Sequence, residues 1–140
     1  MSDVHSARVR SYNMSRIKSK NTKPELVIRK LLHSAGFRFR LHASDLPGKP
    51  DIVLKKYGTV VFVHGCFWHG HEHCRYFVVP KTRTKWWLNK INVNRANDRE
   101  AMEKLQDAGW NVLVLWECEL RKNTIEQTLE QVIQKIRANG

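Results

Sequence analysis

The sequence predicts an α/β domain in which helices flank a mixed β-sheet, and three observations lead to this prediction. Apolar runs of strand length alternate with helix-capping signals, in the order helix, three strands, helix, strand, helix. The chain has 140 residues, 41% of them hydrophobic, which suffices for one buried core without disulfides. No apolar run is long enough to span a bilayer. We therefore expect a basic arm at residues 1–20 and one compact domain at residues 21–140.

The first half of the domain is predicted to be a helix followed by three strands. Thr22 and Glu25 form a capping box with Pro24 in the first turn, and Gly36 closes the helix. Its core-facing residues are expected to be Leu26, Leu31 and Leu32. Strands are expected at residues 37–41, 51–54 and 59–64. The last two form a hairpin, and the third strand is apolar enough to be central.

The second half is predicted to be a loop that has either a function or a cross-link, followed by a long helix, a strand and a last helix. Residues 65–84 are rich in His, Cys and aromatic residues, and they are too long for a passive connection in so small a domain. A helix is expected over residues 85–108, and a break near residues 92–94 is left open. Residues 110–116 are too apolar for an edge strand. The last helix begins at a second capping box that starts at Thr124.

Positive charge is concentrated in the first part of the chain. The formal net charge is +12. Residues 1–50 hold eleven Lys and Arg against three Asp and Glu, whereas residues 101–140 hold five against six. This gradient indicates a polyanionic partner. Nucleic acid is favoured over a membrane, because the basic run lacks an amphipathic pattern with apolar anchors. A merely basic, soluble protein is the alternative.

The three cysteines of the chain fall in a spacing typical of a zinc site. Cys66-x4-His71-x2-Cys74 lies in the irregular segment, and Cys118 follows a strand that would bring it beside that segment. Three thiolates and one imidazole close a tetrahedral Zn²⁺ site with no position for water, so the ion would be structural. His73 competes as fourth ligand, but adjacent residues seldom bind one tetrahedral ion, which favours His71. Three unrelated buried cysteines are the alternative.

A carboxylate at one strand and histidines after the next suggest magnesium-dependent phosphodiester hydrolysis. In magnesium nucleases, groups on two neighbouring strands hold the cation against the scissile phosphate. Asp51 supplies the carboxylate here, but the partner positions, usually acidic and lysine, hold Phe62 and His64. A backbone carbonyl such as that of Val63 would then have to complete the metal site. His64 or His69 would have to transfer the proton. Asp51 is otherwise a turn residue.

Several motifs together resemble the very short patch repair (Vsr) mismatch endonuclease family. In chain order they are Asn13-Met14, Thr22-x-x-Glu25, Leu46-Pro-Gly-Lys-Pro-Asp51, Val63-His-Gly-Cys-Phe-Trp-His-Gly-His71, Pro80-x-Thr-Arg-Thr84 and the segment from Trp110 to Cys118. The resemblance implies a restriction-endonuclease-like fold with a PD-(D/E)xK core. It implies an enzyme that nicks duplex DNA 5′ of the thymine in T:G mismatches left by deamination of 5-methylcytosine. A monomeric, cytoplasmic and nucleoid-associated bacterial enzyme is implied, with a mismatch-repair factor as a candidate partner.

The resemblance also implies a role for individual residues. Asp51 and the carbonyl of Val63 match ligands of a catalytic Mg²⁺. His69 matches the proposed general base, and His64 and Glu25 match supporting active-site residues. The ligands of the structural Zn²⁺ are matched by Cys66, His71, Cys74 and Cys118.

DNA contacts are implied for two further groups of residues. In the family, aromatic residues wedge into the base stack beside the mismatch, and a residue of the N-terminal arm inserts from the opposite groove. The matching positions are Phe67, Trp68 and Trp87 for the first and Met14 for the second. Lys90 and Asn94 match residues that contact the mispair. Core packing is the alternative for the rings, and we prefer it for Trp86, Trp110 and Trp116.

Two other functions are weighed against this one. A zinc-stabilised domain that binds nucleic acid without cutting it would explain the missing second acidic residue at Phe62. A restriction endonuclease of the same fold would cut perfectly paired sites. Metal-dependent cleavage would distinguish an enzyme from a domain that only binds nucleic acid. A preference for mismatched DNA would distinguish a mismatch endonuclease from a restriction endonuclease.

Overall fold

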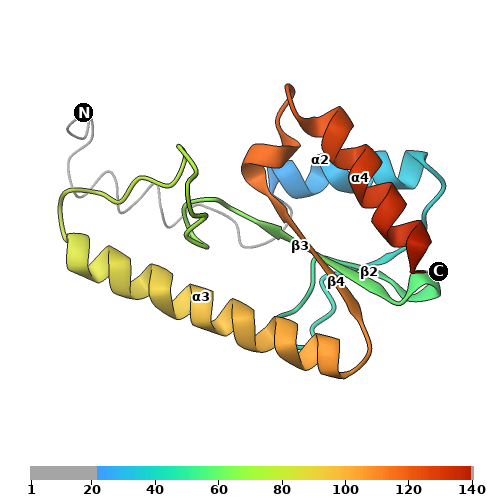
Figure 1. Cartoon of the computed structure of the whole chain (residues 1–140), viewed down its shortest axis with the longest axis horizontal. Coiled ribbons are helices and arrows are strands. Elements are labelled where there is room, and N and C mark those ends of the chain that lie inside the picture. Colours follow the sequence, from blue (N-terminus) through green and yellow to red (C-terminus); the bar gives the residue numbers. More distant parts are fainter. Residues whose placement is uncertain (1–21, 140) are drawn as a thin grey trace.

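A computed structural model of the chain describes residues 22–139 as a four-stranded mixed sheet between helices, in the order β1-β2-β3-β4 (Figure 1). The expected arm and Met14 lie outside the described residues. The elements in chain order are α2 (Lys23–Ser34), β1 (Arg40–Leu41), β2 (Ile52–Leu54), the 3-10 turn η1 (Lys55–Tyr57), β3 (Thr59–His64), α3 (Thr84–Asp107), β4 (Asn111–Trp116), the 3-10 turn η2 (Glu117–Leu120) and α4 (Ile125–Ala138). The predicted order of helices and strands is confirmed.

The strand pairing brings residues that the sequence predicts for the functional site to one end of the sheet. β2 and β3 form the predicted antiparallel hairpin, in which Gly58 turns the chain at a φ of 57°. β4 runs parallel to β3, with Val63 opposite Leu115 and His64 opposite Trp116. The two parallel strands therefore end side by side. The loop after β3 and the turn after β4 meet there.

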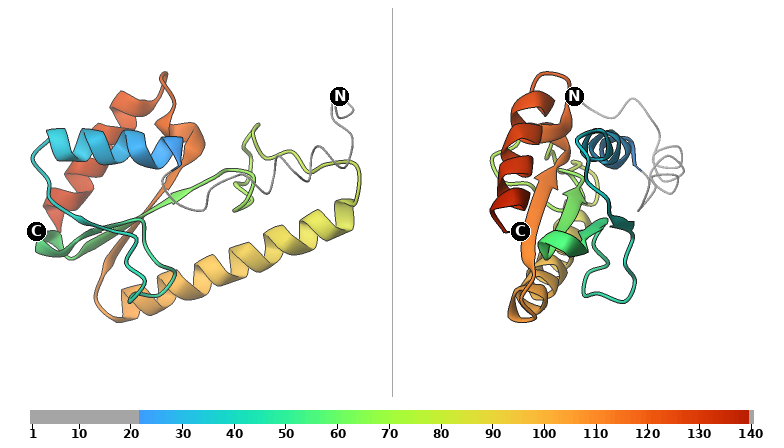
Figure 2. Two further views of the ribbon diagram at one scale, coloured as in Figure 1. Left: turned by 180° about the vertical axis from the view of Figure 1, so that it is seen from behind. Right: turned by 90° about the vertical axis from the view of Figure 1, so that its right-hand side faces the viewer.

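Helices cover both faces of the sheet, and each face has its own hydrophobic cluster. α2 and α4 pack on one face, where Val61 and Leu115 belong to the same hydrophobic cluster as Ile28 and Ile136. The C-terminal half of α3 covers the other face, where Leu105 packs in a cluster with residues of β2 and β3. The alternation of side chains along β3 serves both clusters. In the views of Figure 2, the N-terminal half of α3 continues beyond the sheet beside the segment 65–83.

The position of β4 and the length of β1 differ from what the sequence predicts. β4 was expected away from an edge, but it is the edge strand of the described sheet. Its side chains are nevertheless covered, because Leu113 packs against one cluster and Val112 and Val114 against the other. An apolar strand needs cover on both faces, which the helices supply, rather than a partner on both edges. β1 is also shorter than residues 37–41.

Individual helix signals are confirmed only in part. The hydroxyl of Thr22 accepts a hydrogen bond from the Glu25 amide at 3.4 Å, as the capping box predicts. Thr124 is the N-cap of α4, as predicted, but the predicted capping box is wrong, because the Thr124 hydroxyl donates to the carbonyls of Cys118 and Arg121 and makes no cap bond. Helix α3 runs through residues 92–94 without the break that was left open.

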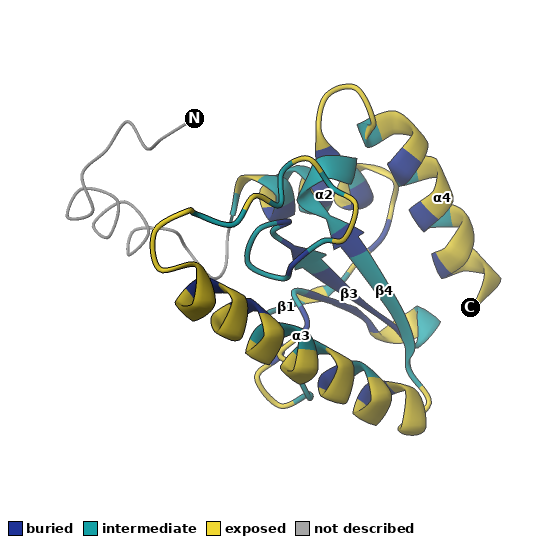
Figure 3. Ribbon diagram, turned by 60° about the vertical axis from the view of Figure 1, so that its left-hand side comes forward, coloured by how far each residue is buried: buried dark blue, intermediate teal, exposed yellow. Residues whose placement is uncertain are grey.

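Burial confirms one predicted core side chain and contradicts two others, and Figure 3 shows that most residues in the N-terminal half of α3 are exposed. Leu26 and Trp86 are 47% and 46% exposed, so their prediction as core residues is wrong. Leu26 lies on α2, and Trp86 lies in the first turn of α3, in the half of the helix that continues beyond the sheet. Trp110 packs partly buried against the cluster under α3, as predicted. No helix within residues 22–139 is both long enough and apolar enough to cross a membrane.

Candidate active site and metal centre

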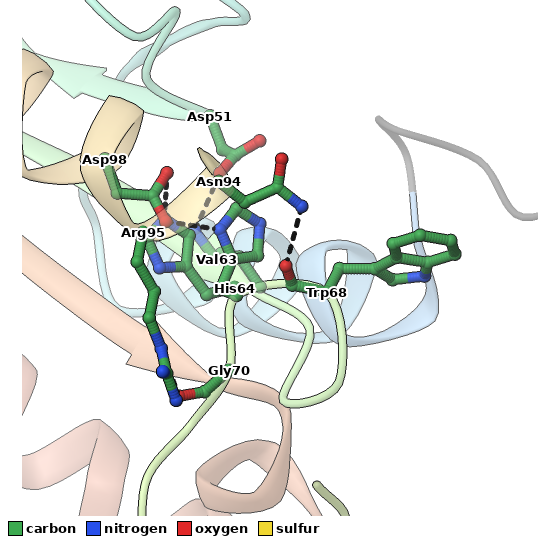
Figure 4. A network of polar contacts seen from close by, with 9 residues as sticks. Asp51, Val63, His64, Trp68, Gly70, Asn94, Arg95 and Asp98 are labelled. Carbon is green, nitrogen blue, oxygen red and sulfur yellow. Dashed lines mark hydrogen bonds and ion pairs between the residues drawn. The ribbon is translucent and has the colours of Figure 1, made fainter. Parts of the chain in front are cut away.

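A cavity of about 530 Å³ opens at the end of the sheet where β2 begins and β3 finishes. Its walls include Asp51, Val63, His64 and His69, four residues predicted for the site, together with Asp98 from α3. The backbone amide of Val63 donates to Oδ2 of Asp51 at 2.7 Å (Figure 4). The antiparallel hairpin thus brings the carboxylate beside the backbone of the next strand. Three separate chain segments meet in this cavity.

Asp51 lies in an environment that opposes its ionisation. Burial raises the pKa of Asp51 to about 6, and the nearby carboxyl of Glu25 contributes to the rise, while the Val63 amide acts against it. Glu25 is 1% exposed and comes from the first turn of α2. Its Oε2 accepts from Arg29 at 3.1 Å and lies 2.6 Å from Nε2 of His42. Donor atoms of Glu25, His42 and Asp51 lie within 4.8 Å of one another.

His42 is a site residue that the sequence did not reveal. A surface or packing role is the ordinary expectation for a lone histidine, but this ring lines the cavity and is bonded to Glu25. The two residues are seventeen positions apart in the chain. No spacing pattern links them, so only the packing of α2 against the strand region could bring them together.

Two histidines and an aspartate form a compact unit on the other side of the cavity. The rings of His64 and His69 stack with centroids 3.8 Å apart and planes at 4°. Nδ1 of His69 lies 2.6 Å from Oδ2 of Asp98, and Nε2 of His64 lies 4.0 Å from its Oδ1. Burial, helped by the neighbouring His69, lowers the pKa of His64 to about 4. His64 is therefore a neutral ring at neutral pH.

Asp98 was missed by sequence reasoning. The one signal that could have found it is its position four residues after Asn94, which places both residues on one face of a helix. Asn94 donates from Nδ2 to the Trp68 carbonyl at 2.8 Å, so this face of α3 lies against the loop that holds His69. Lys90, one turn earlier, is exposed.

The loop aromatics pack together rather than standing free. Phe67, Trp68 and Trp87 contact one another with ring centroids between 5.2 and 5.9 Å apart. Trp87 is only 9% exposed, whereas the first two are half-buried. Trp86 meets the edge of Trp87 at 4.7 Å and projects to the surface. The three residues predicted as DNA wedges thus form one aromatic cluster, with its outer side formed by Trp86.

The predicted zinc ligands converge after β3 and β4. Ligand atoms of Cys66, His71, Cys74 and Cys118 lie within 4.8 Å of one another. Nδ1 of His71 lies 3.5 Å from the Cys118 sulfur, whereas His73 is exposed. Of the two histidines considered as the fourth zinc ligand, the geometry therefore favours His71 over His73.

The donor set also fits the chemistry of Zn²⁺. Burial raises the pKa of the Cys66 thiol to about 12, and the pKa of Cys118 is raised as well, again by burial first. A cation among these sulfurs would offset that cost, since zinc binds thiolates and a coordinating thiol is deprotonated. The indole of Trp116 stacks on the His71 ring at 4.0 Å and limits its orientation.

Comparison with known proteins gives a consistent result. The family model described as "DNA mismatch endonuclease Vsr" matches residues 2–75. The "Type II nicking enzyme V.XorIIP" of Xanthomonas oryzae pv. oryzae is 52% identical and covers 86% of this chain and 88% of its own length. The "DNA mismatch endonuclease Vsr" of Escherichia coli is 45% identical over 100% of this chain and 91% of its own. The "Type II nicking enzyme V.NmeAIP" of Neisseria meningitidis is 44% identical, with 98% of each chain covered.

Proposed function

The chain belongs to the Vsr family of DNA mismatch endonucleases, and we propose that it nicks one strand of duplex DNA 5′ of the thymine in T:G mismatches. The relatives support a DNA endonuclease with DNA as its substrate. The mismatch, its origin in deaminated 5-methylcytosine and the position of the cut are the proposal. Action as a monomer on nucleoid DNA is part of it.

The single observation that carries the proposal is the meeting of Asp51 with the unit of His64, His69 and Asp98 in one cavity. Asp51 and the carbonyl of Val63 would hold a Mg²⁺, since this cation takes oxygen ligands and is often bound by one carboxylate together with substrate phosphate and water. When bound, the cation would lower the pKa of a water molecule and neutralise charge that develops on the phosphate. Oxygen donors at the cavity wall fit this ion.

His69 is suited to remove a proton from the attacking water. The carboxylate of Asp98 accepts a hydrogen bond from the Nδ1–H group, which leaves Nε2 as the ring nitrogen that can take the proton. Asp98 also fixes the ring plane. His64 stacks on this ring and stays neutral, so its N–H can donate a hydrogen bond without adding charge. Glu25 completes the polar wall behind Asp51.

Recognition of DNA is proposed for the surface around this cavity. Phe67, Trp68 and Trp87 would wedge beside the mismatch, and unstacking costs less where pairing is imperfect. Because these three rings contact one another in the free protein, wedging requires the cluster to separate. Lys90 and Asn94 would contact the mispair, and Met14 would insert from the other groove. Zn²⁺ would hold the loop in place.

A nicking assay tests the proposal. Matched and T:G duplexes in varied sequence contexts are incubated with the protein and Mg²⁺ or with a chelator. We expect a single nick on the thymine strand that requires both the metal and Asp51, so that Asp51→Ala is inactive. Binding without a nick would support a non-catalytic module, and equal cutting of matched sites would support a restriction enzyme. Either result would refute the proposed function.

A further inference from the structure

We propose that Arg95 is a positioning residue for His69, which it acts on by holding the backbone of the next residue, Gly70. The inference rests on the proposed function, because His69 is the group proposed to take the proton. Among the residues that the structure describes, Arg95 contacts Gly70, Asn92 and Phe77 and is not part of the cavity wall. Its effect on the reaction would be exerted entirely through the loop.

The guanidinium of Arg95 grips one carbonyl with two donors. Nε donates to the Gly70 oxygen at 3.1 Å, and Nη2 donates to the same oxygen. The remaining nitrogen, Nη1, reaches Oδ1 of Asn92 at 3.5 Å. The guanidinium also lies over the Phe77 ring, 5.3 Å from its centroid. Arg95 therefore links α3 to two points of the loop, at Gly70 and at Phe77.

Neighbouring residues of α3 hold the loop on the other side of the histidine. Asn94 donates to the carbonyl of Trp68 (Figure 4), and Asp98 is bonded to the ring of His69. Three consecutive loop residues are thus each bound by one residue of a single helix. The loop closes on itself as a turn, in which the amides of His69 and His71 donate to the carbonyls of Gly65 and Cys66. The bonds from α3 hold this turn, and with it His69, against the helix.

Gly70 is shaped to receive this arginine. Its backbone has a φ of +60°, and a Cβ atom built on it would lie 2.4 Å from Nε of Arg95 and 2.6 Å from Cγ2 of Ile91. Any side chain at this position would therefore push the guanidinium away or strain the backbone. The missing side chain of Gly70 thus leaves the space in which the guanidinium of Arg95 approaches the backbone. A merely solvent-exposed arginine would need no such space.

The hydrogen bonds from Arg95 to Gly70 lie between the proposed general base and the zinc cluster. Gly70 separates His69 from His71, which belongs to the zinc cluster. Zinc ligation would restrain the far side of Gly70 but not the direction of the His69 side chain. Misplacement of a reacting group by about 1 Å can cost on the order of 100-fold in rate. Loss of these hydrogen bonds is therefore expected to reduce the rate of the chemical step rather than the affinity for DNA.

The test compares Arg95→Gln and Arg95→Lys with Arg99→Gln in the full-length protein loaded with zinc. Arg99 is an exposed arginine of the same helix, so its loss removes the same charge without touching the loop. We measure the single-turnover nicking rate at saturating protein, the Kd for a T:G duplex and its salt dependence. The proton NMR signal of the His69 Nδ1–H that is bonded to Asp98 is recorded in the free protein.

We expect Arg95→Gln to lower the saturated rate by roughly 10- to 100-fold, and to broaden the His69 signal. Its Kd should change no more than that of Arg99→Gln, and Arg95→Lys should recover part of the rate. A saturated rate within twofold of Arg99→Gln would overturn the proposal. So would a change confined to Kd and salt dependence, which would make Arg95 a phosphate contact. If the wild type does not nick, the proposed function fails, and an unchanged His69 signal in Arg95→Gln would refute the positioning role separately.

Discussion

Replacing Asp98 with asparagine removes one hydrogen-bonding charge from the site while keeping its shape. The carboxylate lies 2.6 Å from Nδ1 of His69 and 4.0 Å from Nε2 of His64. An amide can present its NH₂ group to His69, which favours the ring tautomer with the proton on Nε2. That tautomer has no free acceptor for the proton of water. Asp98→Asn is therefore expected to impair proton transfer directly.

The magnitude follows from the bond that is lost. A hydrogen bond to a charged group contributes about 1.5 to 3 kcal/mol, and a tenfold rate change corresponds to about 1.4 kcal/mol. We expect the single-turnover nicking rate to fall by roughly 10- to 150-fold. Removing a negative charge beside a polyanion should leave DNA binding equal or tighter. A slower reaction could then not be attributed to weaker binding.

Asp107→Asn is the matched control. Asp107 is exposed in the last turn of the same helix, so its substitution makes the same chemical change away from the cavity. Single-turnover rates on a T:G duplex and the Kd are measured for both variants. The reasoning about the His69 tautomer is refuted if Asp98→Asn nicks within twofold of Asp107→Asn at saturation.

Three other predictions concern the metal centre, the carboxylate and the aromatic cluster. Metal analysis should find about one Zn²⁺ per chain, and Cys118→Ser should lose it and unfold at a lower temperature, because metal-binding free energy is folding free energy; full retention of the Tm would contradict the zinc site. Since Asp51 has its folded pKa raised from 3.8 to about 6, its ionisation destabilises the metal-free fold progressively as pH rises through this window. Asp51→Asn should therefore add at most about 3 kcal/mol to the free energy of unfolding above pH 6. This is contradicted if urea titrations show no larger stabilisation by Asp51→Asn at pH 7 than at pH 4. Trp87→Ala should cost about 3 kcal/mol as a buried ring, whereas Trp86→Ala should cost far less; equal losses of stability would show that the cluster is not anchored by Trp87.

Local chemistry in the sequence was enough for the elements and for the ligands that lie close together in the chain. The bond between Thr22 and Glu25, the turn at Gly58 and the spacing of Cys66, His71 and Cys74 each act over a few residues. Such signals survive without knowledge of the rest of the fold. The placement of Asp51 beside Val63 followed from pairing two adjacent strands, which is the simplest long-range arrangement.

The tertiary structure alone decided which distant side chains share the site. Asp98 meets His69 across 29 residues, and His42 meets Glu25 across 17, because the rotation of α3 and α2 about their axes fixes which helix faces meet the loop and the strands. The same rotation buries Trp87 and exposes its neighbour Trp86. Composition cannot distinguish two adjacent tryptophans. Only the packing of a helix against a particular loop gives them different surroundings.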